Sequence, residues 1–81
     1  MERGSRGEDV RDVQARLASL GYRTDSDRPG EFGSMTEAAV RAFQQEKGIA
    51  VDGVVGDITW LNIDEAAVFS HPIVQIGRAH V

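Results

Sequence analysis

Two glycine-and-threonine units are the residues of this 81-residue sequence whose types and spacing best suit ligand binding. Gly30 to Thr36 and Gly53 to Thr59 share the pattern Gly-x-apolar-Gly-x-x-Thr, and each stands immediately before a helical pattern. Backbone N–H groups at the start of a helix lack helical partners and can hold an amide oxygen or a carboxylate. The units therefore predict either a ligand site at a helix start or a structural turn in which the Thr hydroxyl bonds nearby backbone.

Residues that could catalyse a reaction are few. The sequence has no cysteine, which excludes a thiol nucleophile and a cysteine-based metal site. A glycosidase needs two carboxylates facing across a cleft, and a zinc hydrolase needs a set of metal ligands. The acidic residues are expected on exposed helix faces and loops, and His71 and His80 follow the repeated units. We expect no catalytic residue, no metal site and no cofactor.

The charge of the chain narrows the choice of partner. Thirteen acidic and nine basic residues give a formal net charge of −4, and the basic residues form no cluster. Such a surface repels phosphate, so we expect no nucleic-acid partner. No stretch approaches the roughly 18 consecutive apolar residues of a membrane span, and the first residues do not begin a signal peptide. We expect no membrane partner, and we expect a monomer.

Three amphipathic patterns supply the elements that position these units. Apolar residues recur at helical spacing over about 8 to 20, 34 to 47 and 57 to 67, and Gly21 and Gly48 follow the first two segments. The fold class is therefore all-α, a compact three-helix bundle with glycine-rich turns. Its predicted core consists of apolar residues from the three helices and the second loop: Val13, Leu17, Val40, Phe43, Val55 and Ile63.

Polar residues give further detail at the helix ends. Ser34 followed by Glu37 predicts a capping box at the start of the second helix. The pair Asp52-Gly53 predicts a tight turn, which we expect to be flanked by a very short β-bridge. Gln14 and Gln44 each follow a core residue and are predicted to satisfy backbone groups of the loops.

The two units, together with Phe43-Gln44 and the sequence Val51-Asp52-Gly53, resemble the small peptidoglycan-binding domain of bacterial and phage cell-wall hydrolases. The resemblance covers about residues 3 to 67. It implies a non-catalytic three-helix module in the cell wall, extracellular or periplasmic, that binds the glycan strand or the stem peptide. It also implies a covalent link to a second repeat or to a hydrolase domain such as an N-acetylmuramoyl-L-alanine amidase.

The resemblance also guides the choice of binding residues. Peptidoglycan offers sugar faces, acetamido groups and carboxylates, so a binder needs an exposed aromatic ring, amide-type hydrogen bonds and positive charge. Family members commonly carry an aspartate where this chain has Pro29. An alternative is a protein-interaction domain that keeps the fold without binding peptidoglycan. The predicted ligand contacts are Tyr22, Arg23, Ser34, Thr36, Arg41 and Gln45.

The end of the chain calls for a separate explanation. Residues 68 to 75 are predicted to form a linker or the start of a truncated following domain. Residues 76 to 81 read Ile-Gly-Arg-Ala-His-Val, which one reading frame of ATC GGA AGA GCA CAC GTC encodes. That string matches a common short-read sequencing adapter, so we hypothesise that these six residues are an adapter read-through tail.

This hypothesis predicts that the genomic locus departs from the present sequence after Gln75. Sequencing of the gene from its native genome checks the prediction. A locus that continues in frame through residues 76 to 81 would show that the tail is native.

Overall fold

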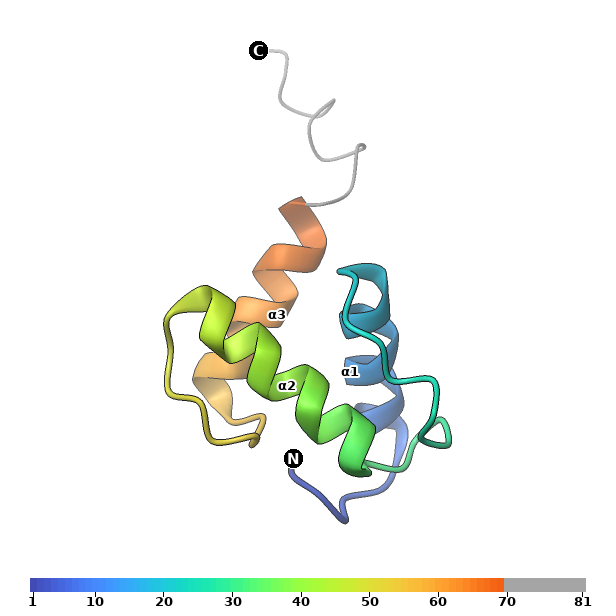
Figure 1. Ribbon diagram of the computed structural model, residues 1–81. Coiled ribbons are helices and arrows are strands. Elements are labelled where there is room, and N and C mark those ends of the chain that lie inside the picture. The colour runs from blue at the N-terminus through green and yellow to red at the C-terminus, as the bar shows by residue number, and fades with distance from the viewer. Residues whose placement is uncertain (70–81) are drawn as a thin grey trace.

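Three α-helices joined by two glycine-rich loops make up the fold (Figure 1). The computed structural model describes residues 1–69, with side chains through Ala66. Helix α1 spans Glu8–Ser19, α2 spans Ser34–Lys47 and α3 spans Asp57–Phe69. The predicted all-α three-helix fold is confirmed, although α3 continues two residues beyond its predicted end. Residues 70–81 lie outside the described part, and with them the predicted tail and most of the predicted linker.

The helix ends follow the glycine positions. Gly48 adopts φ 71° and ψ 27°, a left-handed conformation that glycine reaches without steric cost. The chain turns there, and the Ile49 N–H donates to the Gln44 carbonyl at 3.1 Å. Gly21, with φ 98°, follows α1 in the same way. Both predicted helix stops are therefore confirmed.

The core lies where α1 packs against both α2 and α3. All six predicted core residues are buried, which confirms the helical spacing seen in the sequence. Trp60 is only half-buried, and the Arg16 guanidinium lies 5.6 Å from the centre of its ring. The buried apolar set consists of Val10, Val13, Leu17, Phe32, Ala39, Val40, Phe43, Val55 and Ile63.

The N-terminal segment satisfies backbone groups of both loops. The Gly4 N–H donates to the Phe32 carbonyl at 2.9 Å, and the Phe32 N–H donates to the Ser5 carbonyl at 3.0 Å. In the second loop, the Val55 N–H donates to the Met1 carbonyl. The prediction of a bridge beside Asp52-Gly53 is wrong. Within residues 1–69 the isolated bridge joins Arg6 to Glu31, because the N-terminal segment pairs with the first loop.

The Gln44 side chain forms hydrogen bonds to the second loop. Its side chain is fully buried, and its Nε2 donates to Thr59 Oγ1 at 3.1 Å and to the Val54 carbonyl at 3.0 Å. Its Oε1 accepts from the N–H groups of Asp52 and Gly53 at 3.1 and 3.0 Å. This confirms the prediction that Gln44 satisfies loop backbone groups.

Gln14 does the same for the first loop. Its Nε2 donates to the Glu31 carbonyl at 2.9 Å and to Thr36 Oγ1 at 3.0 Å, and its Oε1 accepts from the Gly30 N–H at 2.7 Å. Thr36 and Thr59 are the last residues of the two glycine-and-threonine units. Each unit is therefore bonded to the buried glutamine of the helix before it.

We predict that Gln44→Met lowers the free energy of unfolding by about 3 kcal/mol. Methionine has a shape similar to that of glutamine but cannot make its hydrogen bonds, so several buried loop groups lose their partners. The matched control is Gln45→Met, the same change at the exposed neighbouring position, which should stay within about 0.5 kcal/mol of wild type. Chemical denaturation of the three proteins measures both values. Equal stability of the two variants would contradict the role given to Gln44.

Candidate functional site

The start of α2 is closed by a carboxylate from the preceding loop. Asp27 Oδ2 accepts from the N–H groups of Thr36 at 2.6 Å and Gly33 at 3.1 Å, and Oδ1 accepts from the Met35 N–H at 3.4 Å. These are the N–H groups that a helix leaves unpaired at its start. Asp27 therefore performs the capping that the sequence analysis assigned to other residues.

The predicted capping box at the start of α2 is wrong. Gly33 is the N-cap residue and has no side chain to cap with, and Ser34 is already the first residue of the helix. Glu37 instead faces Arg3 at 3.4 Å and Arg41 at 3.9 Å. The box does not form because the Glu37 N–H, which the Ser34 hydroxyl would have to bond, donates to the Gly33 carbonyl at 3.0 Å.

The environment of Asp27 keeps its carboxyl ionised. Burial raises the pKa of Asp27, but hydrogen bonds from Thr36, Met35 and Gly33 outweigh burial and bring the pKa below its ordinary value. A Cβ atom built at Gly33 would lie 2.5 Å from Asp27 Oδ1, so glycine is what allows the close approach. A carboxylate thus reaches this helix start from the preceding loop, although Pro29 stands directly before the first glycine-and-threonine unit.

Tyr22 and Arg23 follow the end of α1, and Tyr22 packs beside the last turns of α2. The Tyr22 ring is half-buried and stands edge-on to Phe43, with ring centres 5.7 Å apart, and its hydroxyl donates to Glu46 at 2.9 Å. Arg23 is exposed and pairs with Asp25 at 3.1 Å. Tyr22 is therefore anchored by its neighbours and presents only part of its ring to solvent.

The other predicted contacts lie along α2 and differ in accessibility. Thr36 is fully buried, its hydroxyl accepts from Gln14 and its N–H donates to Asp27, so neither group is open to a ligand. Ser34, Arg41 and Gln45 are exposed. Within residues 1–69, no hydrogen bond or ion pair links the two residues beside α1 to these four on α2. Tyr22 is bonded to Glu46 near the end of α2, whereas Ser34 lies in the first turn of that helix, so the six residues do not form one cluster.

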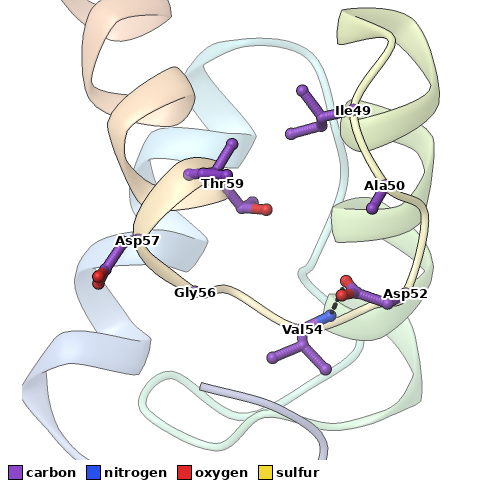
Figure 2. Close-up of a pocket in the computed structure, with 8 residues that line it drawn as sticks. Ile49, Ala50, Asp52, Val54, Gly56, Asp57 and Thr59 are labelled. Carbon is purple, nitrogen blue, oxygen red and sulfur yellow. Dashed lines mark hydrogen bonds between the residues drawn. The ribbon is translucent and has the colours of Figure 1, made fainter.

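A pocket of about 600 Å³ lies between the second loop and the first turn of α3 (Figure 2). The sequence alone points only to the N–H groups at this helix start. Most of its lining is apolar, and the loop and the helix contribute residues to opposite walls. The lining residues are Ile49, Ala50, Asp52, Val54, Gly56, Asp57, Ile58 and Thr59.

The charged side chains of this pocket are acidic. Asp52 Oδ1 accepts from the Val54 N–H at 3.0 Å, the dashed line of Figure 2, and from Gln44 Nε2 at 2.8 Å. The bond from Val54 contributes most, and the two bonds together hold the pKa of Asp52 below its ordinary value. The carboxyl is therefore ionised at neutral pH. Asp57 is the second carboxylate, and no basic side chain lines the pocket.

The start of α3 differs from the start of α2 in having no carboxylate cap. Within residues 1–69, the N–H groups of Asp57 and Ile58 make no hydrogen bond to a loop or side chain. The second loop is shorter: Gln44 and Thr59 are 15 residues apart, whereas Gln14 and Thr36 are 22 apart. No counterpart of Asp27 reaches this helix. The pocket lies beside the open N–H groups.

The space around Gly33 and Gly56, the glycines directly before α2 and α3, differs in the same way. A Cβ built at Gly33 collides with Asp27, but a Cβ built at Gly56 meets no atom within 4 Å. Gly56 also lies outside the left-handed region of backbone conformation. The position that a carboxylate fills at α2 is thus empty space at α3. The repeated pattern in the sequence could have pointed to this site, because the second unit has no aspartate at the matching distance.

The described residues contain neither a cluster of metal ligands nor a membrane-spanning helix. Over residues 1–69, no group of three or more His, Cys, Asp and Glu side chains could hold a metal ion. In the same part of the chain, no helix is long and apolar enough to cross a membrane.

Residues 6–61 match the protein family described as "Putative peptidoglycan binding domain". The chain belongs to this family. The resemblance seen in the glycine-and-threonine units is therefore confirmed. This places the chain in a family of helical domains that occur in cell-wall hydrolases, and the peptidoglycan-binding domain covers most of the chain.

Two known proteins that are similar to this peptidoglycan-binding domain are larger enzymes. The zinc D-Ala-D-Ala carboxypeptidase of Streptomyces albus G is 41% identical over 64 residues, 78% of this chain and 25% of the enzyme. The N-acetylmuramoyl-L-alanine amidase CwlM of Mycobacterium tuberculosis is 43% identical over 53 residues, 65% of this chain and 13% of the enzyme. The chain thus spans a quarter or less of the length of these two relatives.

A solved structure shares the fold. The crystal structure of the SleB N-terminal domain is 40% identical, with a TM-score of 0.76, and the alignment covers 83% of this chain and 90% of that one. An identity at this level with near-complete coverage shows that the two domains have the same architecture.

We predict that Asp27→Ala destabilises the peptidoglycan-binding domain by about 1 to 2 kcal/mol at pH 7, because it uncaps α2. The folded-state pKa of Asp27 is below the unfolded value of about 3.9, so this stabilisation is complete above that value and is lost as pH falls through the folded pKa. The difference in free energy of unfolding between wild type and variant should therefore decrease below about pH 4. Denaturation curves from pH 2 to 7 measure it.

The control for this prediction is Asp25→Ala in the same loop. Asp25 is exposed and pairs only with an exposed arginine, so its loss should change stability little. A stability gap for Asp27→Ala that stays constant between pH 7 and pH 2 would contradict the ionised cap.

Proposed function

We propose that this peptidoglycan-binding domain is a non-catalytic anchor that holds a linked wall hydrolase, such as an N-acetylmuramoyl-L-alanine amidase, on its substrate. The single observation that carries the proposal is the family match over residues 6–61 in a chain that spans only a small part of its enzyme relatives. In such enzymes the reacting groups belong to another part of the protein. The proposed location is the cell wall, outside the cytoplasm.

We further propose that the ligand binds at the pocket beside the start of α3. The pocket combines an apolar lining with open backbone donors, and small-molecule sites commonly have this composition and a volume of about 300 to 1,000 Å³. The contacts predicted at Tyr22, Arg23, Ser34, Thr36, Arg41 and Gln45 remain a competing proposal. Of the six, all except Thr36 offer side chains that a ligand could reach, and none of the six lines the pocket.

A single domain should bind weakly. One small domain buries little ligand surface, so we expect a Kd in the upper micromolar range or weaker. Two linked copies would convert the second contact into an intramolecular one and would raise apparent affinity by about 10² or more. Weak single-site binding is compatible with an anchor, because the wall presents many copies of its repeating unit.

We predict that the purified chain co-sediments in part with washed insoluble peptidoglycan, and that a tandem fusion of two copies is retained more completely. Soluble fragments of digested peptidoglycan should release both proteins. An acidic protein of similar size serves as the control for non-specific trapping. The same samples, assayed for released reducing sugar and new amino groups, should show no hydrolysis.

Two results would contradict this proposal. Hydrolysis that disappears on heat denaturation of the chain would show that the domain is itself catalytic. Failure of both the single and tandem proteins to sediment would favour the interaction-domain alternative. The exposed apolar side chains Ile58 and Leu61, with 67% and 59% of their surfaces accessible, lie on α3 and would be the first surface to test for a protein partner.

A further inference from the structure

We infer that the pocket beside α3 takes the neutral N-acetyl group of an amino sugar rather than the carboxylate of a stem peptide. The inference rests on the proposed function and specifies which part of peptidoglycan this site recognises. It follows from three features of the pocket: its apolar lining, the sign of its charges and its open backbone donors.

The apolar lining suits a methyl group. Ile49, Ala50, Val54 and Ile58 all line the pocket, and Figure 2 shows Ile49 directed from the loop into the space in front of α3. Burial of a methyl group against such side chains is favourable by the hydrophobic effect. A sugar hydroxyl placed there would lose water without gaining a partner, so the lining favours the acetamido substituent over the rest of the ring.

The charges disfavour an anion. Asp52 and Asp57 both line the pocket, and none of the lining residues is basic. A carboxylate bound here would be repelled by the like charge of Asp52. An acetamido group is neutral and avoids this repulsion. Its N–H can donate to a carboxylate such as that of Asp52, which has one oxygen, Oδ2, without a hydrogen bond from residues 1–69.

The backbone donors suit the acetamido oxygen. The N–H groups of Asp57 and Ile58 make no loop or side-chain hydrogen bond within residues 1–69, and Gly56 leaves free space in front of them. At α2 the N–H groups of Gly33, Met35 and Thr36 face Asp27, so within this chain the same turn holds an oxygen ligand. The matching positions at α3 are Gly56, Ile58 and Thr59. At α3 the oxygen would come from the ligand, and the acidic lining selects a neutral carbonyl over a carboxylate.

The test compares three probes by titration into isotope-labelled protein. The first is the β-1,4-linked tetramer of N-acetylglucosamine, the second is the β-1,4-linked tetramer of glucose, and the third is a sugar-free stem tetrapeptide. The two sugars are neutral and share their linkage but differ in the acetamido groups. We expect the backbone amide signals of the pocket residues to shift with the first probe and to respond about tenfold more weakly to the other two.

Two variants at Gly56 test the site without damage to the core. Gly56→Ser places a hydroxyl where it can bond the first N–H groups of α3, so it should lower binding of the N-acetylglucosamine tetramer about tenfold while thermal stability is kept or raised. Gly56→Val fills the pocket with side-chain atoms and should lower binding to a similar or greater extent. Ala18→Val, on the exposed face of α1, is the control and should bind as wild type does.

The outcomes separate this inference from the proposed function. If the wild-type chain sediments with peptidoglycan but the stem peptide or the glucose tetramer shifts the pocket signals equally, the N-acetyl assignment is overturned. If the N-acetylglucosamine tetramer shifts signals of Tyr22, Arg23 and Gln45 instead, the pocket is overturned as the site. If the chain does not sediment and no probe binds, the proposed function fails together with the inference.

Discussion

The hydrogen bonds of two buried glutamine side chains are the constraint on which the rest of this domain depends. Gln14 and Gln44 are each bonded to a loop and to the threonine at the end of a glycine-and-threonine unit. A primary amide has two donors and an oxygen that accepts twice, so it can join several backbone groups at one buried point. The core is small and the chain has no disulfide, so these bonds fix the path of both loops and thereby the start of α2 and of α3.

Loop length then decides what each helix start can do. The first loop is long enough to return Asp27 to the N–H groups of α2, and Gly33 gives the carboxylate room. The second loop is shorter, so nothing from it reaches α3, and Gly56 borders a pocket instead. The two units have the same glycine pattern and the same threonine. One is closed by an internal ligand and the other is left open to an external one.

The helices and core could be predicted from the sequence because they depend on local periodicity. Val13, Leu17, Val40 and Phe43 repeat at helical spacing, and that spacing alone identifies the buried face. The caps and the pocket could not be predicted in the same way. Asp27 lies nine residues before Thr36, whose N–H it binds. The polar residues around Asp27 have no periodicity, so the sequence gives no sign that its carboxylate folds back to the helix. The Ser34 and Glu37 pattern was misleading for the same reason, since a residue from outside the local window supplied the cap.

The missing cap at the start of α3 lowers the stability of the domain. An uncapped start costs about 1 kcal/mol relative to one with a good capping residue, a large share of the few kcal/mol that stabilise a domain of this size. A serine or aspartate at the position of Gly56 would recover that stability in space that is already free. Positions where a local rule is broken without structural need are often those used for binding. The open donors beside an apolar pocket fit that pattern, because the same cap that would stabilise the fold would also compete with a ligand for the N–H groups.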